Sequence, residues 1–252
     1  MKQALLLAFT SMLLVSAPSF AGVPPEAFAH NKKGIELYKT GKVDAAIAEF
    51  KKALEVDPKN VDYHNNLSAV LLAQGKIAEA TKEAELAVKS KPSDGKSNYN
   101  LGGLLLRQNK NADAEKRFAV AAKAAPANHD YQLEYANTLL LNNKTAEAEK
   151  AFRQALKAKP KSAAALAGLA NILRTQKKLD DAEKQARAAV AAGASEPAAH
   201  LSLAGVLKDR HKDKDAAAEY QTVLKLKPDH PDAKSIRAQI DYLNNKVDSR
   251  IP

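Results

Sequence analysis

The stretch GKSNYNLGGLLLRQNKNADAEKRFAVAAKAAPAN, residues 95–128, decides the fold of this chain. Apolar residues fall at helical spacing in two runs, one of Leu101, Leu104 and Leu105, the other of Ala114, Phe118 and Ala121. Asn109 lies between the runs and tolerates the left-handed conformation that ends a helix. Pro126 follows the second run, and Asn128 is a good N-cap for a further helix. The stretch therefore predicts a helix, a tight turn and a second helix.

The same pattern recurs along the chain with a fixed period. Prolines stand 34 residues apart at Pro58, Pro92, Pro126 and Pro160; the register skips at Ala194 and returns at Pro228. A period of this length indicates a repeat architecture. With each proline at position 32, the repeats are residues 27–60, 61–94, 95–128, 129–162, 163–196 and 197–230.

Several positions of the repeat hold one kind of residue. Position 20 is alanine in all six repeats, and position 8 holds Gly34, Ser68, Gly102, Ala136, Ala170 and Ala204, so two helices can approach closely at these sites. Position 24 is mostly a large filler, as in Phe50, Phe118 and Phe152. The turn position, position 15, holds Gly41, Gly75, Asn109, Asn143, Lys177 and His211. Position 34 supplies the N-caps Asn60, Asp94, Asn128 and Ser162; in the fifth repeat, Ser195 and Pro197 offer a cap and a first-turn proline.

These columns resemble the tetratricopeptide repeat (TPR) family over residues 27–230. The resemblance implies an all-α fold, an α-solenoid of six helix-turn-helix repeats wound as a right-handed superhelix. The aromatic residue usual at position 4 is replaced by His30, His64, Asn98, Gln132, Leu166 and His200. We therefore expect the helix pairs to be anchored less tightly than in the family's strongest examples.

The two ends of the chain do not follow the repeat. Residues 1–21 combine Lys2, a short apolar run and a small-x-small site before Gly22, the pattern of a cleaved secretory signal peptide rather than a retained anchor. Residues 22–26 are a short linker. Residues 231–247 carry one apolar stripe and predict a C-terminal capping helix, and residues 248–252 form a tail. A second interpretation makes the last helix a docking helix for a partner, with Tyr242 as the residue to test.

The absence of cysteine excludes disulfides and a lipid anchor on a mature N-terminal cysteine. No segment after the signal peptide is long and apolar enough to cross a bilayer. We expect an exported, soluble protein, either periplasmic or secreted.

The chain is basic, with a formal net charge of +10, which falls by one to +9 when the predicted signal peptide removes Lys2. Acid–base pairs at positions 19 and 22, such as Asp113 and Lys116, predict a solvated outer face. The excess charge lies near the ends of the second helices, at Lys89, Lys91, Lys123, Lys157, Lys159, Lys225 and Lys227. These lysines complement helix dipoles, or they form a basic rim for an anionic lipid, a polysaccharide or an acidic partner. Few aromatic residues lie among them, so we do not expect nucleic-acid binding.

No catalytic motif is present: there is no cysteine nucleophile, His-Glu-x-x-His, Gly-x-Ser-x-Gly or phosphate-binding loop. His30 and His64 share position 4 of adjacent repeats, which suggests a metal site, but Asp62 is the only obvious carboxylate nearby. Zinc usually takes more ligands, so polar replacement of an aromatic column is the favoured interpretation. We expect neither an enzyme nor a cofactor or bound metal.

The resemblance implies that positions 2, 5, 6, 9, 12 and 13 of each first helix line a concave groove that binds a protein or peptide. The candidate groove residues are Asn65, Asn66, Tyr99, Asn100, Arg107, Glu134, Asn137, Asn171 and Arg174. Asparagine carries both a donor and an acceptor, so it can pair with a peptide backbone. Small residues such as Gly168 and Gly205 either admit a partner's backbone or serve packing. The predicted function is a non-catalytic adaptor or scaffold in envelope assembly or secretion, with the basic rim as the alternative site.

Overall fold

The computed structural model describes residues 24–248, with side chains up to Lys246. The predicted signal peptide, residues 22–23 of the linker and residues 249–252 of the tail lie outside this range. Every helix or strand in the described part of the chain is an α-helix, as the repeat predicts.

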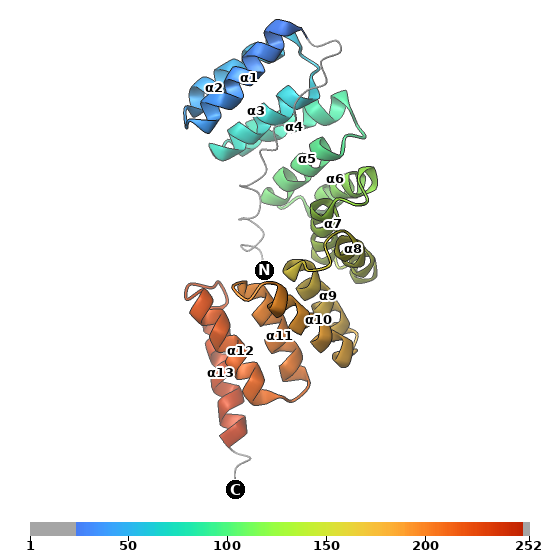
Figure 1. Ribbon diagram of the computed structural model, residues 1–252, viewed down its shortest axis with the longest axis vertical. Coiled ribbons are helices and arrows are strands. Elements are labelled where there is room, and N and C mark those ends of the chain that lie inside the picture. The colour runs from blue at the N-terminus through green and yellow to red at the C-terminus, as the bar shows by residue number, and fades with distance from the viewer. Residues whose placement is uncertain (1–23, 249–252) are drawn as a thin grey trace. The chain divides into compact units, whose positions relative to one another are not determined.

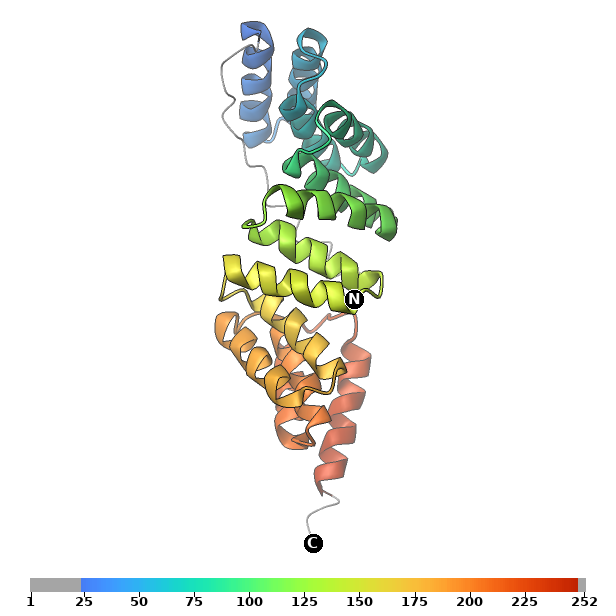
Figure 2. The same cartoon turned by 90° about the vertical axis from the view of Figure 1, so that its right-hand side faces the viewer.

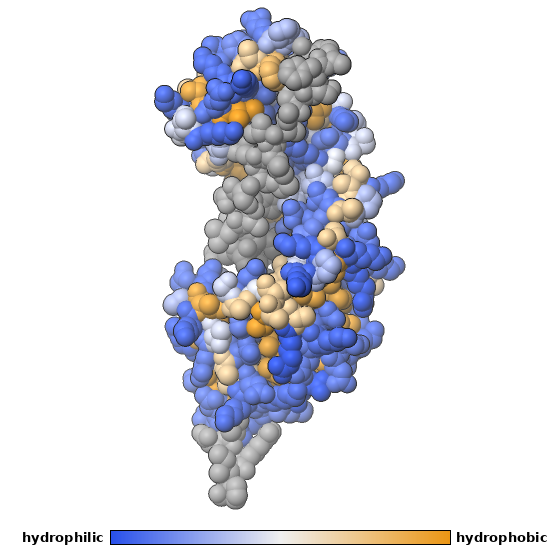
Figure 3. All heavy atoms as spheres, viewed as in Figure 1, coloured by the Kyte–Doolittle hydropathy of each residue, from blue (hydrophilic) through white to orange (hydrophobic). Residues whose placement is uncertain are grey.

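The chain divides into two compact units, which meet in sequence between Ala125 and Pro126. The first unit contains α1 (Pro25–Lys39), α2 (Val43–Val56), α3 (Val61–Ala73), α4 (Ile77–Ser90), α5 (Gly95–Arg107) and α6 (Asn111–Ala124). The second contains α7 (His129–Leu141), α8 (Thr145–Ala158), α9 (Ala163–Thr175), α10 (Leu179–Ala192), α11 (Pro197–Asp209), α12 (Asp213–Leu226) and α13 (Ala233–Asp248). Within each unit, helices that are consecutive in the chain pack side by side (Figures 1 and 2). On the face shown in Figure 3, hydrophilic residues cover most of each unit between smaller hydrophobic areas.

The helix ends follow from the residues at positions 15 and 34. All six turn residues have a positive φ, from 58° at His211 to 78° at Gly41. The side chains of Asn60, Asp94, Asn128 and Ser162 each accept hydrogen bonds from backbone N–H groups in the first turn of the next helix. The fifth repeat differs from the prediction. Its N-cap is Glu196 rather than Ser195, without a side-chain cap bond, and Pro197 occupies the first turn.

Three glycines lie against phenylalanine rings, which explains why these positions are small. A Cβ atom added at Gly34 would lie 2.8 Å from the ring of Phe50, and one at Gly102 would lie 2.9 Å from the ring of Phe118. In the fourth repeat position 8 is alanine, and the ring of Phe152 meets Gly168 of the following repeat instead. Each phenylalanine at position 24 is therefore matched by a missing side chain on a neighbouring helix.

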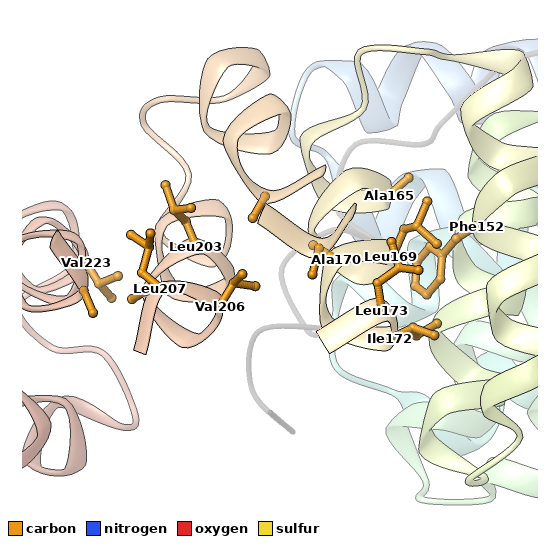
Figure 4. Packing of buried hydrophobic residues seen from close by; sticks show 14 of the residues in the cluster. Phe152, Ala165, Leu169, Ala170, Ile172, Leu173, Leu203, Val206, Leu207 and Val223 are labelled. Atoms are coloured by element: carbon orange, nitrogen blue, oxygen red, sulfur yellow. The ribbon is translucent and has the colours of Figure 1, made fainter. Parts of the chain in front are cut away.

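The core of the second unit is continuous from α7 to α13. Phe152 and Leu169 are buried between α8 and α9, and Leu203 and Leu207 continue the cluster on α11 (Figure 4). Ile236, Ile240 and Leu243 of α13 are buried in the same cluster. The apolar stripe predicted for residues 231–247 thus covers the last repeat.

Polar residues at position 4 form hydrogen bonds that connect neighbouring helices or successive repeats. Nδ1 of His30, His64 and His200 lies 2.6, 2.7 and 2.6 Å from Oε2 of Glu49, Glu83 and Glu219, respectively. In two other repeats, the residue at position 4 bonds to the preceding repeat: Asn98 and Gln132 donate to the carbonyl oxygens of Pro92 and Pro126 at 2.9 and 3.4 Å. Hydrogen bonds here replace the apolar contact that an aromatic ring would make.

Candidate peptide-binding face

The predicted groove residues lie on the first helix of each repeat. We use the term A-helix face for positions 2, 5, 6, 9, 12 and 13 of α1, α3, α5, α7, α9 and α11. Because the chain forms two units, the face is described separately in each.

In the first unit, amide side chains of the A-helix face form a ladder between successive repeats. Nδ2 of Asn66 donates to Oδ1 of Asn31 at 2.9 Å, and Nδ2 of Asn100 donates to Oδ1 of Asn65 at 3.3 Å. Asn65 in turn donates to Oγ of Ser97 at 2.8 Å. The ladder fixes the orientation of the Asn65 amide, since both its oxygen and its nitrogen have defined partners.

The ladder residues differ in how accessible they are. Asn65 and Asn66 are only 2% and 6% exposed, whereas Asn100 is half-buried. An amide that is nearly inaccessible supports its neighbours and does not by itself offer a surface to a partner. Asn100 is the ladder amide with accessible surface, and Asn65 holds it in place.

Tyr99 and Arg107 also come from α5 but have different surroundings. The ring of Tyr99 is buried and meets the ring of Phe118 edge-on, with centroids 5.6 Å apart and planes inclined by 72°. Arg107 is half-buried in the last turn of α5. Tyr99 therefore contributes chiefly to the core of its repeat, while Arg107 keeps part of its surface accessible.

In the second unit, Glu134 takes the ladder position on α7. It is 7% exposed, and burial, opposed by a hydrogen bond with Asn137 and aided by the charge of Asp130, raises its pKa to about 7. Its Oε2 atom is buried without a hydrogen-bond partner among the described residues. Near neutral pH a fraction of Glu134 is protonated, and in that state the carboxyl group can donate as well as accept.

The rest of this face is more open. Asn171 on α9 is exposed, and its Oδ1 accepts a hydrogen bond from Oγ of Ser202 at 3.2 Å. Nη1 of Arg174 donates to Oδ2 of Asp209 at 3.3 Å. A Cβ atom added at Gly205 would lie 3.5 Å from Cζ of Arg174, an ordinary contact. Gly205 therefore leaves space beside Arg174, whereas Gly168 serves the packing of Phe152.

The lysines of the predicted rim lie at the surface of both units. Six of them are exposed and Lys227 is half-buried. Lys91 lies 3.9 Å from Asp94, and within residues 24–248 none of the other six forms an ion pair. The charge of these six lysines is thus not neutralised by an ion pair within the described residues.

The histidines that suggested a metal site are instead held by hydrogen bonds. Position 23 is glutamate in the three repeats where position 4 is histidine, and in no other repeat. The sequence contains this correlation, because the glutamate follows the histidine by 19 residues in each of these repeats. No group of three or more His, Cys, Asp or Glu side chains in the described range is placed to hold a metal ion.

Helix pairs of fixed length, joined by turns whose central residue has a positive φ, define an α-helical repeat protein. Family profiles described as TPR repeat and tetratricopeptide repeat match residues 34–75 and, in three overlapping segments, residues 99–231. The matches cover more than half of the chain, which therefore belongs to the tetratricopeptide repeat family.

Solved structures with the same fold include PilF of Pseudomonas aeruginosa, with a TM-score of 0.71 at 20% identity over 85% of this chain and 97% of that one. YrrB, described as a TPR protein with an unusual peptide-binding site, has a TM-score of 0.62 at 17% identity over 75% and 97% of the two chains. A chain of the APC/C hetero-tetramer Cut9–Hcn1 has a TM-score of 0.67 at 16% identity over 86% of this chain and 43% of that one. No curated protein matches the sequence significantly. None of the described helices has the length and apolar character that crossing a membrane requires.

Proposed function

We propose that this protein is a non-catalytic scaffold that binds an extended segment of a protein partner along its A-helix face. The family supports a role in protein–protein interaction, and YrrB provides an example of a TPR protein with a peptide-binding site. The observation that carries the proposal is the amide ladder, in which Asn65 orients Asn100 at 3.3 Å.

Ordered amides suit a peptide backbone because both present donors and acceptors. The side-chain NH₂ of Asn100 has two hydrogens, and its bond to Asn65 uses one of them. Asn137 is half-buried and Asn171 is exposed, so the second unit offers amides of the same chemistry. Because these groups are held in place before binding, a partner loses less free energy in ordering them.

The test replaces the accessible amides and leaves the buried ones unchanged. Asn100→Ala and Asn137→Ala should together weaken a partner that crosslinks to a photoreactive residue at Asn171. Asn100→Ala alone, which leaves the hydrogen bond between Asn137 and the buried Glu134 in place, should leave the melting temperature close to that of the parent. A photoreactive residue at Lys150, which is exposed on α8, is the control position. Equal crosslinking of the partner at Asn171 and Lys150, or crosslinking at Asn171 that neither substitution weakens, would contradict the proposal.

We further propose that the protein works outside the cytoplasm, in envelope assembly or secretion. The support is the signal-peptide pattern of residues 1–21, with cleavage before Gly22. Expression of the full sequence in a Gram-negative host should yield a mature protein that begins at Gly22 in the periplasmic or medium fraction. An uncleaved cytoplasmic product would contradict this part of the proposal.

The competing function is binding of an anionic surface by the rim lysines, favoured by the absence of ion pairs at six of the seven within residues 24–248. Lys89→Glu, Lys123→Glu and Lys157→Glu would then abolish binding to vesicles that contain phosphatidylglycerol. The scaffold proposal expects these substitutions to leave capture at Asn171 intact.

A further inference from the structure

An open hollow of about 580 Å³ lies near the C-terminal end of the second unit. Its walls come from the turns that follow α9 and α11, from the end of α11 and from α13. The lining residues are Lys177, Lys208, Asp209, His211, Gln239, Tyr242 and Lys246. The volume lies within the range typical of ligand sites, roughly 300–1,000 Å³.

The charge of the hollow is predominantly positive. Asp209 is the single carboxylate in the lining, and Arg174 pairs with it at 3.3 Å. Lys246 pairs with Asp213 at 3.0 Å, whereas Lys177 and Lys208 form no ion pair in the part of the chain that the structure describes. Nζ of Lys208 donates to Oε1 of Gln239 at 3.1 Å, which holds its ammonium group at the wall.

Two of these residues occupy the left-handed backbone conformation, which is uncommon for residues other than glycine. Lys177 and His211 have φ angles of 61° and 58° at the turn position of adjacent repeats. The other four repeats place glycine or asparagine there, which adopt this conformation more readily. Both exceptions line the hollow. A strained residue kept in place by its surroundings points to a function for its side chain.

We infer that this hollow binds an acidic segment of a protein partner. The ammonium groups attract carboxylates, the amide of Gln239 can pair with a peptide backbone, and the ring of Tyr242, 59% exposed, offers apolar contact to a side chain. The described lining contains no arginine fork and no helix N-terminus, the features that most favour phosphate. Basic groups, an amide and a ring on neighbouring walls suit a peptide better than a small anion.

The inference rests on the proposed function in one respect, that the partner is a protein. The test measures fluorescence anisotropy of a labelled hexaglutamate peptide and of its hexaglutamine counterpart on the full mature chain. Lys177→Asn combined with Lys208→Gln removes two charges from the hollow, and Asn suits the left-handed turn. Lys157→Gln combined with Lys225→Gln removes two charges from exposed positions outside the hollow and is the matched control.

We expect hexaglutamate to bind more tightly than hexaglutamine. The Lys177→Asn, Lys208→Gln variant should lose about tenfold in affinity for hexaglutamate, whereas the control variant should lose about twofold or less. Lys177→Asn alone should also raise the melting temperature, because asparagine adopts the left-handed conformation of this turn with less backbone strain. Equal losses in both double variants would show diffuse charge attraction and overturn the inference. The same holds if inorganic phosphate or phosphatidylglycerol vesicles displace the peptide at lower concentration than unlabelled hexaglutamate does.

The two proposals fail separately. A partner captured at Asn171 that ignores Lys177→Asn and Lys208→Gln would overturn the acidic-segment site and leave the scaffold function standing. Site-specific binding of hexaglutamate by a protein that captures nothing at Asn171 would support the acidic-segment site and contradict the scaffold function.

Discussion

Nδ1 of His64 lies 2.7 Å from Oε2 of Glu83, so one side chain joins the two helices of the second repeat. Nε2 of the same ring lies 3.0 Å from the carbonyl oxygen of Pro58, which belongs to the first repeat. His200 repeats this arrangement with Glu219 and with the carbonyl of Ala194, where the proline column is interrupted. His64 and His200 thus each connect three segments of the chain.

The stability contributed by His64 should depend on pH. Burial lowers the pKa of His64, but the hydrogen bonds to Glu83 and Pro58 and the charges of Glu83 and Asp57 outweigh it, and the net pKa is raised above 6.5. The folded state therefore holds the proton more tightly than the unfolded state. This contribution is fully present below pH 6.5 and is lost as pH rises through the folded pKa.

A double-mutant cycle of His64→Ala and Glu83→Ala, followed by urea unfolding at pH 5.5 and pH 8.5, measures this contribution. We expect a coupling free energy of about 1–3 kcal/mol at the lower pH and a smaller one at the higher pH. A coupling that is the same at both values would show that the pair acts through neutral hydrogen bonds alone.

The periodic part of the fold could be predicted from sequence because each position performs one local task. Gly41 and Asn109 end helices, Asn60 and Asp94 begin them, and these roles need no knowledge of distant residues. The pairing of Phe152 with Gly168 could not be predicted in this way. The ring can turn toward its own repeat or the next, and packing decides between them.

The candidate site was harder to predict, for a physical reason. Helical spacing indicates which face a residue belongs to but not whether a neighbour satisfies its polar group. Asn66 and Asn100 both occupy position 6, yet one is 6% exposed and the other half-buried. The hollow beside Tyr242 depends on how α13 packs, which the repeat pattern does not specify.

Glu134 should destabilise the folded protein at alkaline pH. Burial is the main reason that its pKa rises from 4.5 to about 7, so the folded state retains a proton that the unfolded state has lost. Stability therefore falls as pH rises from about 4.5 through about 7. Glu134→Gln removes this titration and should stabilise the protein by up to about 3 kcal/mol at pH 8.5, with little difference at pH 4. Urea unfolding across this pH range tests it, and a constant difference would contradict the assignment.

Ala148 should tolerate no larger side chain. It is fully buried in the core of the second unit, at position 20, which is alanine in all six repeats. Ala148→Phe should lower the free energy of unfolding by about 1–3 kcal/mol through overpacking. Ala146→Phe, at an exposed position of the same helix, is the control and should change stability little. Equal effects of the two variants would contradict the repeat register.

Two glycines of the A-helix face should respond to alanine with opposite signs. Both lie within helices, where replacing glycine by alanine contributes about 1 kcal/mol in helix propensity. At Gly168 the added Cβ would overlap the ring of Phe152, which is itself fully buried and cannot move aside easily. Overpacking of this kind costs about 1–3 kcal/mol. Gly168→Ala should therefore lower the free energy of unfolding.

At Gly205 the nearest atom to the new Cβ would be Cζ of Arg174 at 3.5 Å, an ordinary contact with a flexible side chain. Gly205→Ala should therefore raise the free energy of unfolding by up to about 1 kcal/mol. The same methyl group would occupy the space beside Arg174, so this variant also reports on binding. A gain in stability with weaker capture at Asn171 would place the partner's backbone at Gly205, whereas unchanged capture would show that the partner does not reach this position.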